Sequence, residues 1–222
     1  MAKVKVFLSA GHGGSDPGAV GYGMKEKDIN LNILLTCNEE LVRHGVSTVL
    51  SRTKYENDPV SEEVKEANKS GAKIAVSFHT NAGGGDGSET FYYNTSTEGK
   101  KLAKLCEKHT QAIGQNSRGV KATTTLKFCK DTDMTAVLCE CAFIDNDKDN
   151  DIIDTVAEQK KFGVAYAKAI LEYLDITYKE KVVATTTDKL YYVKVGAYSD
   201  KKNAEAMVEK LKAKGFDAYI TC

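Results

Sequence analysis

The chain has 222 residues, of which 31 are Lys or Arg and 31 are Asp or Glu, so its formal net charge at pH 7 is zero. This length suits one medium-sized domain with a small appendage. The balanced charge gives no field that would attract nucleic acid, and no apolar run approaches the roughly 20 residues of a membrane-inserted helix.

The chain begins Met-Ala-Lys-Val-Lys-Val and leads directly into a strand-like segment, without the apolar core of a signal peptide. We therefore expect synthesis in the cytoplasm without a signal peptide. The six cysteines form no CxxC pair, and most have apolar neighbours. Buried thiols are favoured over a disulfide framework or a thiolate zinc site.

Strand-like and helix-like segments alternate along the chain, which is typical of an α/β domain. The pattern predicts strands at about 3–10, 45–51, 73–79, 88–93 and 136–142. It predicts helices at about 26–44, 61–70, 98–114 and 152–173. The expected fold is a single twisted, mostly parallel sheet with helices on both faces.

The composition changes after this domain, because residues 177–189 contain Lys-Glu-Lys and three consecutive threonines. Such a polar segment is typical of a linker. Residues 190–222 then predict a small βαβ unit, with strands at about 191–197 and 217–221 and a helix that Asp200 caps. A unit this small needs a partner surface to hold a core. The expected domains are 1–176 and 190–222, joined by 177–189.

Three segments share one format, in which an apolar strand ends on a side chain that can bind metal or transfer a proton. These side chains are His12, His79 and Glu140. Parallel strands present their carboxyl ends along one edge of a sheet, so residues distant in sequence can meet there. Glu26, which begins the first long helix, is a fourth candidate.

Two histidines and one carboxylate are a recurrent ligand set for catalytic zinc, and they leave a position for water or a substrate oxygen. His12, Glu26 and His79 would supply this set. Glu140 would then take a proton from the water and deliver it to a leaving amine. The residues alone therefore indicate metal-assisted hydrolysis of an amide or ester.

Each candidate also has a purely structural interpretation. A histidine at a strand end is often a hydrogen-bonded rim residue, and Glu26 would be stabilised by the helix dipole without any metal. The glycines around His12 let the backbone approach a ligand closely, whereas no GxxxxGK[ST] motif supports phosphate binding. Glu140 lies in an apolar strand, where a buried charge needs a partner.

Four segments, in order, carry a family resemblance. They are Ser-Ala-Gly-His12-Gly-Gly-Ser-Asp-Pro-Gly-Ala, Glu26-Lys-Asp-Ile-Asn-Leu, Val-Ser-Phe-His79-Thr-Asn-Ala and Leu-Cys-Glu140-Cys-Ala-Phe-Ile-Asp-Asn. Over about residues 3–173 the chain resembles the zinc-dependent N-acetylmuramoyl-L-alanine amidases. The resemblance implies hydrolysis of the peptidoglycan amide that joins the lactyl group of N-acetylmuramic acid to L-alanine.

The resemblance also implies one zinc ion per chain, held by His12, Glu26 and His79, with Glu140 as the catalytic carboxylate. Asn81 and Asn146 are candidate substrate contacts. Two departures from the family pattern concern substrate contacts rather than the ligand set. The helix at 61–70 lacks the arginine usual in the family, and Asp145 replaces a small residue.

Residues 190–222 resemble one half of a sporulation-related repeat, a peptidoglycan-binding module that is normally present in two copies. Two chains that pair their halves would form a homodimer through residues 191–222. Peptidoglycan is thus the expected partner of both parts of the chain.

A wall-lytic enzyme without a signal peptide must reach the wall after cell lysis or through a membrane hole. This fits a phage endolysin or the mother-cell lysin of a spore former, and the endolysin is slightly favoured. Two alternatives remain open. One is a catalytically idle wall-binding module, and the other is a zinc peptidase or deacetylase that acts on another wall bond.

Overall fold

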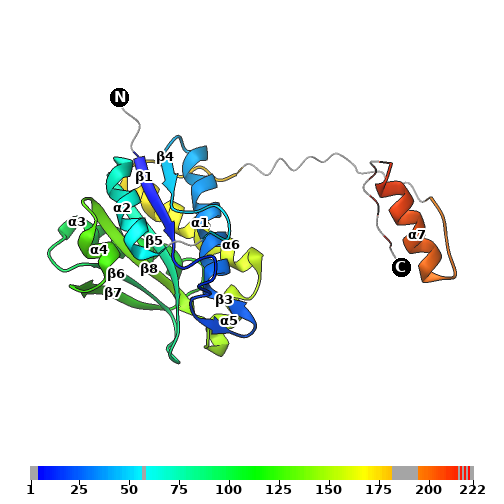
Figure 1. Cartoon of the computed structure of the whole chain (residues 1–222), viewed down its shortest axis with the longest axis horizontal. Helices are drawn as coiled ribbons and strands as arrows, with labels where there is room; N and C mark the ends of the chain where they lie inside the picture. Colours follow the sequence, from blue (N-terminus) through cyan, green and yellow to red (C-terminus); the bar gives the residue numbers. More distant parts are fainter. Residues whose placement is uncertain are drawn as a thin grey trace. The chain divides into compact units, whose positions relative to one another are not determined.

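A computed structural model describes residues 5–56, 59–181 and 195–214, together with residues 216, 218 and 220. The chain divides into two compact units, Met1–Lys179 and Glu180–Cys222. The first unit contains the sheet, and the second contains helix α7 (Figure 1). Among the described residues, no helix combines the length and apolar character that crossing a bilayer requires.

A six-stranded sheet with the order β4-β1-β5-β8-β6-β7 forms the centre of the first unit. Its strands are β1 (Lys5–Ala10), β4 (Ser47–Leu50), β5 (Ile74–Asn81), β6 (Ser88–Tyr93), β7 (Ser117–Thr123) and β8 (Thr135–Phe143). All neighbouring strands are parallel except β6 and β8, which pair antiparallel. The expected α/β fold with a mostly parallel sheet is therefore confirmed.

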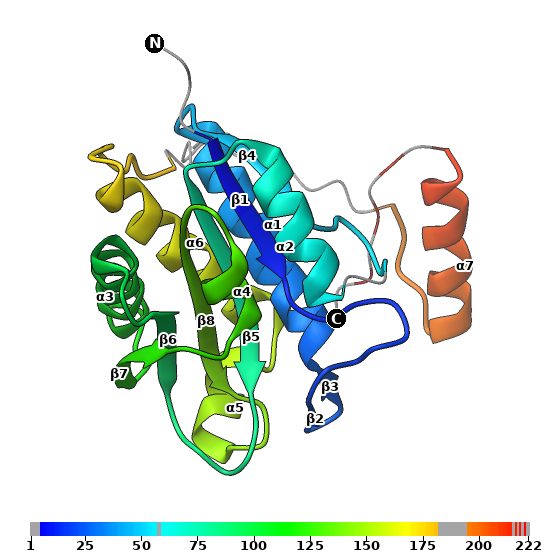
Figure 2. The ribbon, with the colours of Figure 1, turned by 60° about the vertical axis from the view of Figure 1, so that its left-hand side comes forward.

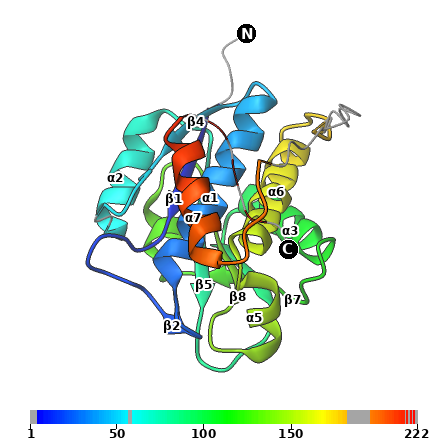
Figure 3. The same cartoon turned by 90° about the vertical axis from the view of Figure 1, so that its right-hand side faces the viewer.

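Helices cover both faces of this sheet. One face packs on α1 (Glu26–Arg43), α3 (Thr97–Gln111) and α6 (Val156–Tyr173), and the other packs on α2 (Val60–Ser70) and α4 (Lys127–Asp131). Figure 3 shows α2 on the opposite side of the sheet from α3 and α6. Side chains alternate between the two cores, as Leu8 and Phe7 illustrate.

Three local features differ from the sequence predictions. The helix expected at 152–173 is two helices, α5 (Asp147–Ile153) and α6, because the Thr155 side chain caps a new helix by accepting the N–H of Glu158. Strand β7 was not predicted, and neither was the antiparallel hairpin of β2 (Val20–Gly21) and β3 (Met24–Lys25). These strands are short or polar, so their periodicity is weak.

The first unit continues past α6 to a contact with α1. The Tyr178 ring stacks on His44 at 4.8 Å between centroids, and the Tyr178 hydroxyl donates to Glu40 at 3.0 Å. The backbone N–H of Lys179 donates to Nε2 of His44 at 2.8 Å. These contacts hold the chain on the first unit up to Lys179.

In the second unit, α7 (Lys201–Lys212) is capped by the Asp200 side chain, which accepts the N–H of Lys202. The predicted N-cap is therefore confirmed. The apolar side chains of α7 are only partly covered, and no residue of the helix is buried. The strands expected at 191–197 and 217–221 lie largely outside the described residues.

Candidate metal centre

The ends of β1 and β5 and the first turn of α1 bring three ligand-type side chains together. His12 follows β1, Glu26 begins α1, and His79 lies near the end of β5. Their nearest ligand atoms all lie within 4.8 Å of one another. Nε2 of His12 is 3.2 Å from Oε2 of Glu26, and Nδ1 of His79 is 3.0 Å from Oε1 of Glu26. Three of the four residues predicted to bind metal or transfer a proton thus share one cluster.

The backbone holds Glu26 in place from both sides. The N–H of Ala19 donates to Oε2 at 2.9 Å, and the N–H of Thr80 donates to Oε1 at 3.0 Å. The amide of Asn30 also donates to Oε1 at 3.2 Å, and it donates to the Gly11 carbonyl as well. Glu26 is therefore a fixed carboxylate and not a freely moving side chain at a helix end.

Glycines leave the space that the cluster occupies. A Cβ on Gly11 would lie 2.0 Å from the His79 ring, and a Cβ on Gly18 would lie 2.6 Å from Oε2 of Glu26. His12 has a φ of 65°, which is uncommon for a residue with a side chain. Backbone strain of this kind clusters at functional sites.

Asp16 orients His12, a contact that the sequence prediction missed. Oδ2 of Asp16 is 2.8 Å from Nδ1 of His12, and Oδ1 accepts the N–H of Gly18 at 3.0 Å. A carboxylate on one ring nitrogen leaves the other nitrogen, Nε2, directed at the cluster. The signal in the sequence is a carboxylate four residues after the histidine in a glycine-rich loop.

Arg52 is a second residue that the sequence prediction missed. Its side chain is buried, and it donates to the carbonyls of Ala10 at 2.9 Å and Lys27 at 2.7 Å. These bonds tie the end of β1 to the first turn of α1. Arg52 thereby fixes the two backbone segments that carry His12 and Glu26.

The cluster has strongly shifted pKa values. The hydrogen bond with Glu26 raises the pKa of His12 to about 9, although burial opposes this shift. Burial alone would raise the pKa of Glu26, but the hydrogen bonds from His12 and His79 outweigh it and hold that pKa well below its usual value. Burial is the largest single influence on His79 and would lower its pKa. The hydrogen bond to Glu26 and the negative charges of Glu140, Glu26 and Glu63 together outweigh burial, so the pKa of His79 is raised.

The donor set fits a divalent metal ion. Two imidazole nitrogens and one carboxylate converge, and the imidazoles favour a transition metal or zinc over magnesium or calcium. The carboxylate of Asp16 behind His12 is the kind of outer contact that supports a metal-bound imidazole. A positive ion would also compensate the negative charge that Glu26 carries in its buried position.

Glu140 lies on the strand next to His79. The register of β5 and β8 pairs His79 with Glu140, and the register of β6 and β8 pairs Glu89 with Glu140. Oε2 of Glu140 is buried and has no hydrogen-bond partner among the described residues. Burial raises the pKa of the Glu140 carboxyl to about 7; Glu26 and Glu89 add to the rise, and His79 opposes it. Such a carboxyl can exchange a proton near neutral pH.

The neighbours of Glu140 in β8 point away from it, as the period of a strand predicts. Cys139 and Cys141 are fully buried and belong to the core that faces α1, α3 and α6. Both are free thiols, and burial raises the pKa of the Cys141 thiol well above its usual value. The two cysteines therefore fill the core and take no part in the cluster.

The two candidate substrate residues lie in different settings. Asn81 donates from its amide to Oε1 of Glu89 at 3.1 Å, next to the position of Glu140. Asn146 caps α5, and its side-chain oxygen accepts two backbone N–H groups there. Asp145 accepts the N–H groups of Gly83 at 2.8 Å and Gly84 at 3.0 Å, so it anchors the loop after β5.

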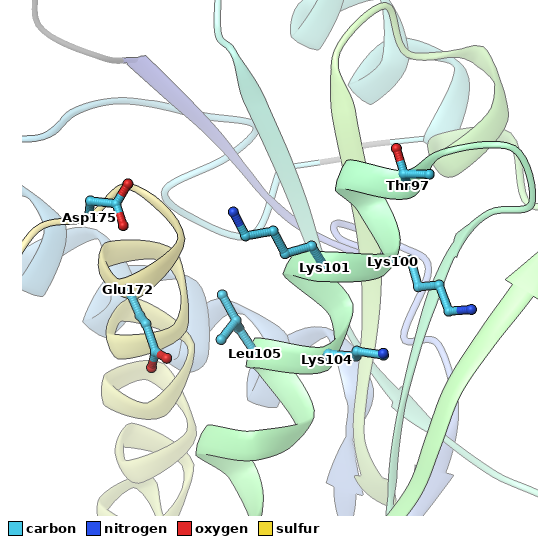
Figure 4. A pocket seen from close by; sticks show the side chains of 7 residues that line it. All are labelled: Thr97, Lys100, Lys101, Lys104, Leu105, Glu172 and Asp175. Carbon is cyan, nitrogen blue, oxygen red and sulfur yellow. The ribbon is translucent and has the colours of Figure 1, made fainter.

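A cavity of about 510 Å³ lies away from this cluster, beside α3 and the end of α6. In Figure 4, Lys101 and Leu105 extend from α3 toward Glu172 and Asp175. None of the clustered histidines and carboxylates lines this cavity. This cavity is therefore not part of the candidate site, although it is large.

Two family models match the chain. The model described as N-acetylmuramoyl-L-alanine amidase matches residues 6–172, and the model described as SPOR domain matches residues 187–221. The first match covers β1 to α6 and includes every residue of the cluster and Glu140.

Similar proteins and a similar solved structure carry related names. A sporulation-specific N-acetylmuramoyl-L-alanine amidase of Bacillus subtilis is 32% identical and aligns over 98% of this chain and 84% of its own length. An endolysin of Bacillus phage SPP1 is 34% identical over 81% of this chain and 69% of its own length. The crystal structure of an N-acetylmuramoyl-L-alanine amidase from Clostridium difficile 630 has a TM-score of 0.73 at 29% identity, over 79% of this chain and 98% of that one.

Proposed function

The chain belongs to the N-acetylmuramoyl-L-alanine amidase family, and from this premise we propose that His12, Glu26 and His79 hold a zinc ion beside the catalytic carboxylate Glu140. The reaction is hydrolysis of the peptidoglycan amide between N-acetylmuramic acid and L-alanine, and it lyses the cell wall. The observation that carries the proposal is the convergence of three ligand atoms within 4.8 Å, next to a buried carboxyl.

In this proposal His12, Glu26 and His79 would hold the metal ion, and Glu140 would transfer protons. Zinc, when bound, makes water acidic enough to act as a nucleophile at neutral pH and polarises the scissile carbonyl. Asp16 keeps Nε2 of His12 turned toward Glu26, and the N–H groups of Ala19 and Thr80 keep the Glu26 carboxylate turned toward both histidines. The donor set is therefore organised before any ion arrives.

Glu140 performs the proton transfers. It accepts a proton from the attacking water and passes it to the nitrogen of L-alanine as the amide bond breaks, because the amine is a poor leaving group without that proton. A pKa of about 7, raised by burial, lets one carboxyl act as base and then as acid near neutral pH. Its one buried oxygen, Oε2, has no competing partner among the described residues.

We propose that the rest of the chain delivers this site to the wall. The sequence predicts a catalytic domain at 1–176, a linker at 177–189 and a wall-binding domain at 190–222. Because Tyr178 and Lys179 pack on His44, we place the start of the linker after Lys179, and the SPOR match to 187–221 supports the wall-binding domain. Because α7 has no buried residue, we also propose that the tails of two chains pair in a homodimer. Alignment with a sporulation-specific relative over 98% of the chain supports mother-cell lysis as the biological setting.

The ligand set is tested by metal analysis of single variants. His79→Ala should lose zinc and activity together, because one of three protein ligands is removed. His109→Ala is the matched control, since its ring contacts Glu172 on α6 and is outside the cluster. Mass spectrometry under native conditions should find one zinc per wild-type and His109→Ala chain. Full zinc occupancy in His79→Ala would remove His79 from the ligand set.

A further inference from the structure

A row of charged or ligand-type side chains crosses the sheet on the face that carries the candidate site. Register places His79 of β5 beside Glu140 of β8, and Glu140 beside Glu89 of β6. Arg118 of β7 extends this row, because its Nε donates to Oε2 of Glu89 at 2.9 Å. Figure 2 shows β5, β8, β6 and β7 side by side in this order.

A bulge in β7 places Arg118 in the row. The register of the β6 and β7 pair shifts next to Glu89, so two residues of β7, Arg118 and Gly119, face one residue of β6. Gly119 has a φ of 81°, which a residue with a side chain rarely adopts. Bulges of this kind re-aim a side chain and are common beside active sites.

Ser117 anchors the bulge on the opposite face. Its hydroxyl donates to the buried carboxylate of Glu107 on α3, and it accepts the N–H of Gly119 at 2.9 Å. Glu107 also accepts hydrogen bonds from Ser88 and Thr90 of β6. Because successive side chains of a strand alternate between faces, the anchor of Ser117 on α3 turns the next side chain toward the row.

The contacts of Arg118 leave its two terminal nitrogens open. The guanidinium carbon of Arg118 lies 5.1 Å from the ring centroid of Phe143. The carboxylate of Glu89 that accepts from Arg118 is itself fixed, because its Oε1 accepts a hydrogen bond from the Asn81 amide. Nη1 and Nη2 have no hydrogen-bond partner within the described part of the chain, and 41% of the side chain is exposed. A guanidinium held in this way presents a planar fork of donors, which suits a carboxylate.

We propose that Arg118 determines specificity by binding a carboxylate of the stem peptide on the leaving-amine side of the scissile bond. The inference rests on the proposed function, in which Glu140 delivers a proton to that amine. Neighbouring strands are about 4.8 Å apart, so Arg118 lies roughly 10 Å from Glu140. A peptide advances at most about 3.6 Å per residue, and a hydrogen bond adds about 2.9 Å. Two stem residues and one hydrogen bond therefore cover this distance, so a carboxylate on the second stem residue can reach Arg118.

The test compares two synthetic muramoyl dipeptides that differ in one group. One carries a free α-carboxylate on its second residue, and the other carries a carboxamide there. The zinc-loaded full chain should cleave the carboxylate form with the higher kcat/KM. Arg118→Gln should lose roughly ten- to a hundredfold in kcat/KM on the carboxylate form, mainly through KM, and less than about twofold on the carboxamide.

Two further variants separate recognition from folding. Arg118→Lys keeps a positive charge but lacks the planar fork, so its preference should be intermediate. Arg43→Gln is the matched control, because Arg43 also pairs with a glutamate, Glu40, but on α1 outside the row. It should leave both kcat/KM values unchanged. Calorimetric binding of both dipeptides to Glu140→Gln, with and without Arg118→Gln, measures the same preference without cleavage.

Each outcome is decisive. Equal losses on the two dipeptides would reduce Arg118 to a structural tie between β6 and β7, and would overturn the inference. A wild-type chain without preference, or an Arg118→Gln variant without loss, would also overturn it. If the wild type cleaves neither dipeptide while Glu140→Gln still binds the carboxylate form more tightly through Arg118, the proposed reaction fails and the inference stands.

Discussion

Glu140 is a carboxylate in a strand whose other residues are largely apolar, and its neighbours explain its chemistry. Burial disfavours the charged form and raises the pKa to about 7, and His79 on the adjacent strand opposes that rise. Glu89 on the other side adds negative charge. The reactivity of this one residue is therefore set by the strands that flank it.

We expect Glu140→Gln to keep its zinc and to lose activity by roughly 10² to 10⁴, because a positioned acid and base contributes about this factor. The substitution keeps the shape of the side chain but removes the proton it would transfer. Glu62→Gln, an exposed residue of α2 that pairs with Lys65, is the control and should be fully active. Near-normal turnover of a zinc-loaded Glu140→Gln chain would show that another group moves the proton.

We expect zinc affinity to rise with pH. In the metal-free chain the hydrogen bond with Glu26 raises the pKa of His12 to about 9, and the imidazole must lose its proton to bind metal. Affinity should therefore climb about tenfold per pH unit for each proton released, from pH 6.5 up to about 9. Competition with a chromophoric chelator, corrected for the chelator's own protonation, measures this slope. Flat affinity over that window would contradict it.

The same pKa shift affects the metal-free protein with the opposite sign. A pKa raised from 6.5 to about 9 means that the pairing of His12 with Glu26 stabilises the fold fully below pH 6.5. This contribution is lost as the pH rises through about 9. Chelator-treated protein should thus become less stable over the pH range in which zinc binding improves.

The sequence predicts His12, His79 and Glu140 because a ligand-type side chain stands out at the end of an apolar strand. Asp16 and Arg52 were missed since their roles depend on loop and tertiary contacts that no periodicity records. Glu89 lies beside Glu140 only because β6 and β8 pair antiparallel in this register, which the sequence does not reveal. Residues that act through their neighbours therefore become visible only in the folded chain.

At the scale of elements, the sequence predicts those with strong periodicity. The helix that begins at Glu26 and the strand that ends near His79 were predicted correctly, because their apolar positions repeat and a glycine follows the helix. Strand β7 carries Arg118, Gly119 and Lys121 among few apolar residues, so its pattern is weak. The break between α5 and α6 depends on the Thr155 cap, a short signal within a continuous helical pattern.

Close packing of α1 on α6 makes Gly163 sensitive to substitution. A Cβ there would lie 2.6 Å from Cβ of Thr36 and 2.7 Å from the Ile33 carbonyl oxygen. We expect Gly163→Ala to lower the free energy of unfolding by roughly 1–3 kcal/mol, despite the better helix propensity of alanine. Urea denaturation should show this loss, with Lys160→Ala on the exposed side of α6 as the control. Unchanged stability would mean that the two helices separate at little cost.

The whole molecule combines a catalytic unit with a second unit whose helix has no buried residue. The sequence predicts this division from a change in composition, but it places the end of the first unit at 176. Contacts of Tyr178 and Lys179 with His44 extend that unit to Lys179. They bring together residues about 135 positions apart, so no local pattern predicts them.

We expect a truncation to residues 1–179 to cleave soluble muramoyl peptides as well as the full chain does, because the whole cluster lies within it. It should lose most of its binding to intact wall sacculi, as measured by co-sedimentation. Analytical ultracentrifugation should find a dimer for the full chain and a monomer for the truncation. Monomers in both samples would exclude the paired tails, and undiminished wall binding would place the binding surface on the catalytic unit.

The most direct test of the account is digestion of purified peptidoglycan by the zinc-loaded chain, with mass spectrometry of the products and a chelator-treated sample. The account predicts free stem peptides that begin with L-alanine, an intact glycan, and no reaction after chelation. Cleavage within the peptide, release of acetate, or undiminished cleavage after complete zinc removal would contradict it. Tight wall binding without any cleavage would instead favour an idle binding module.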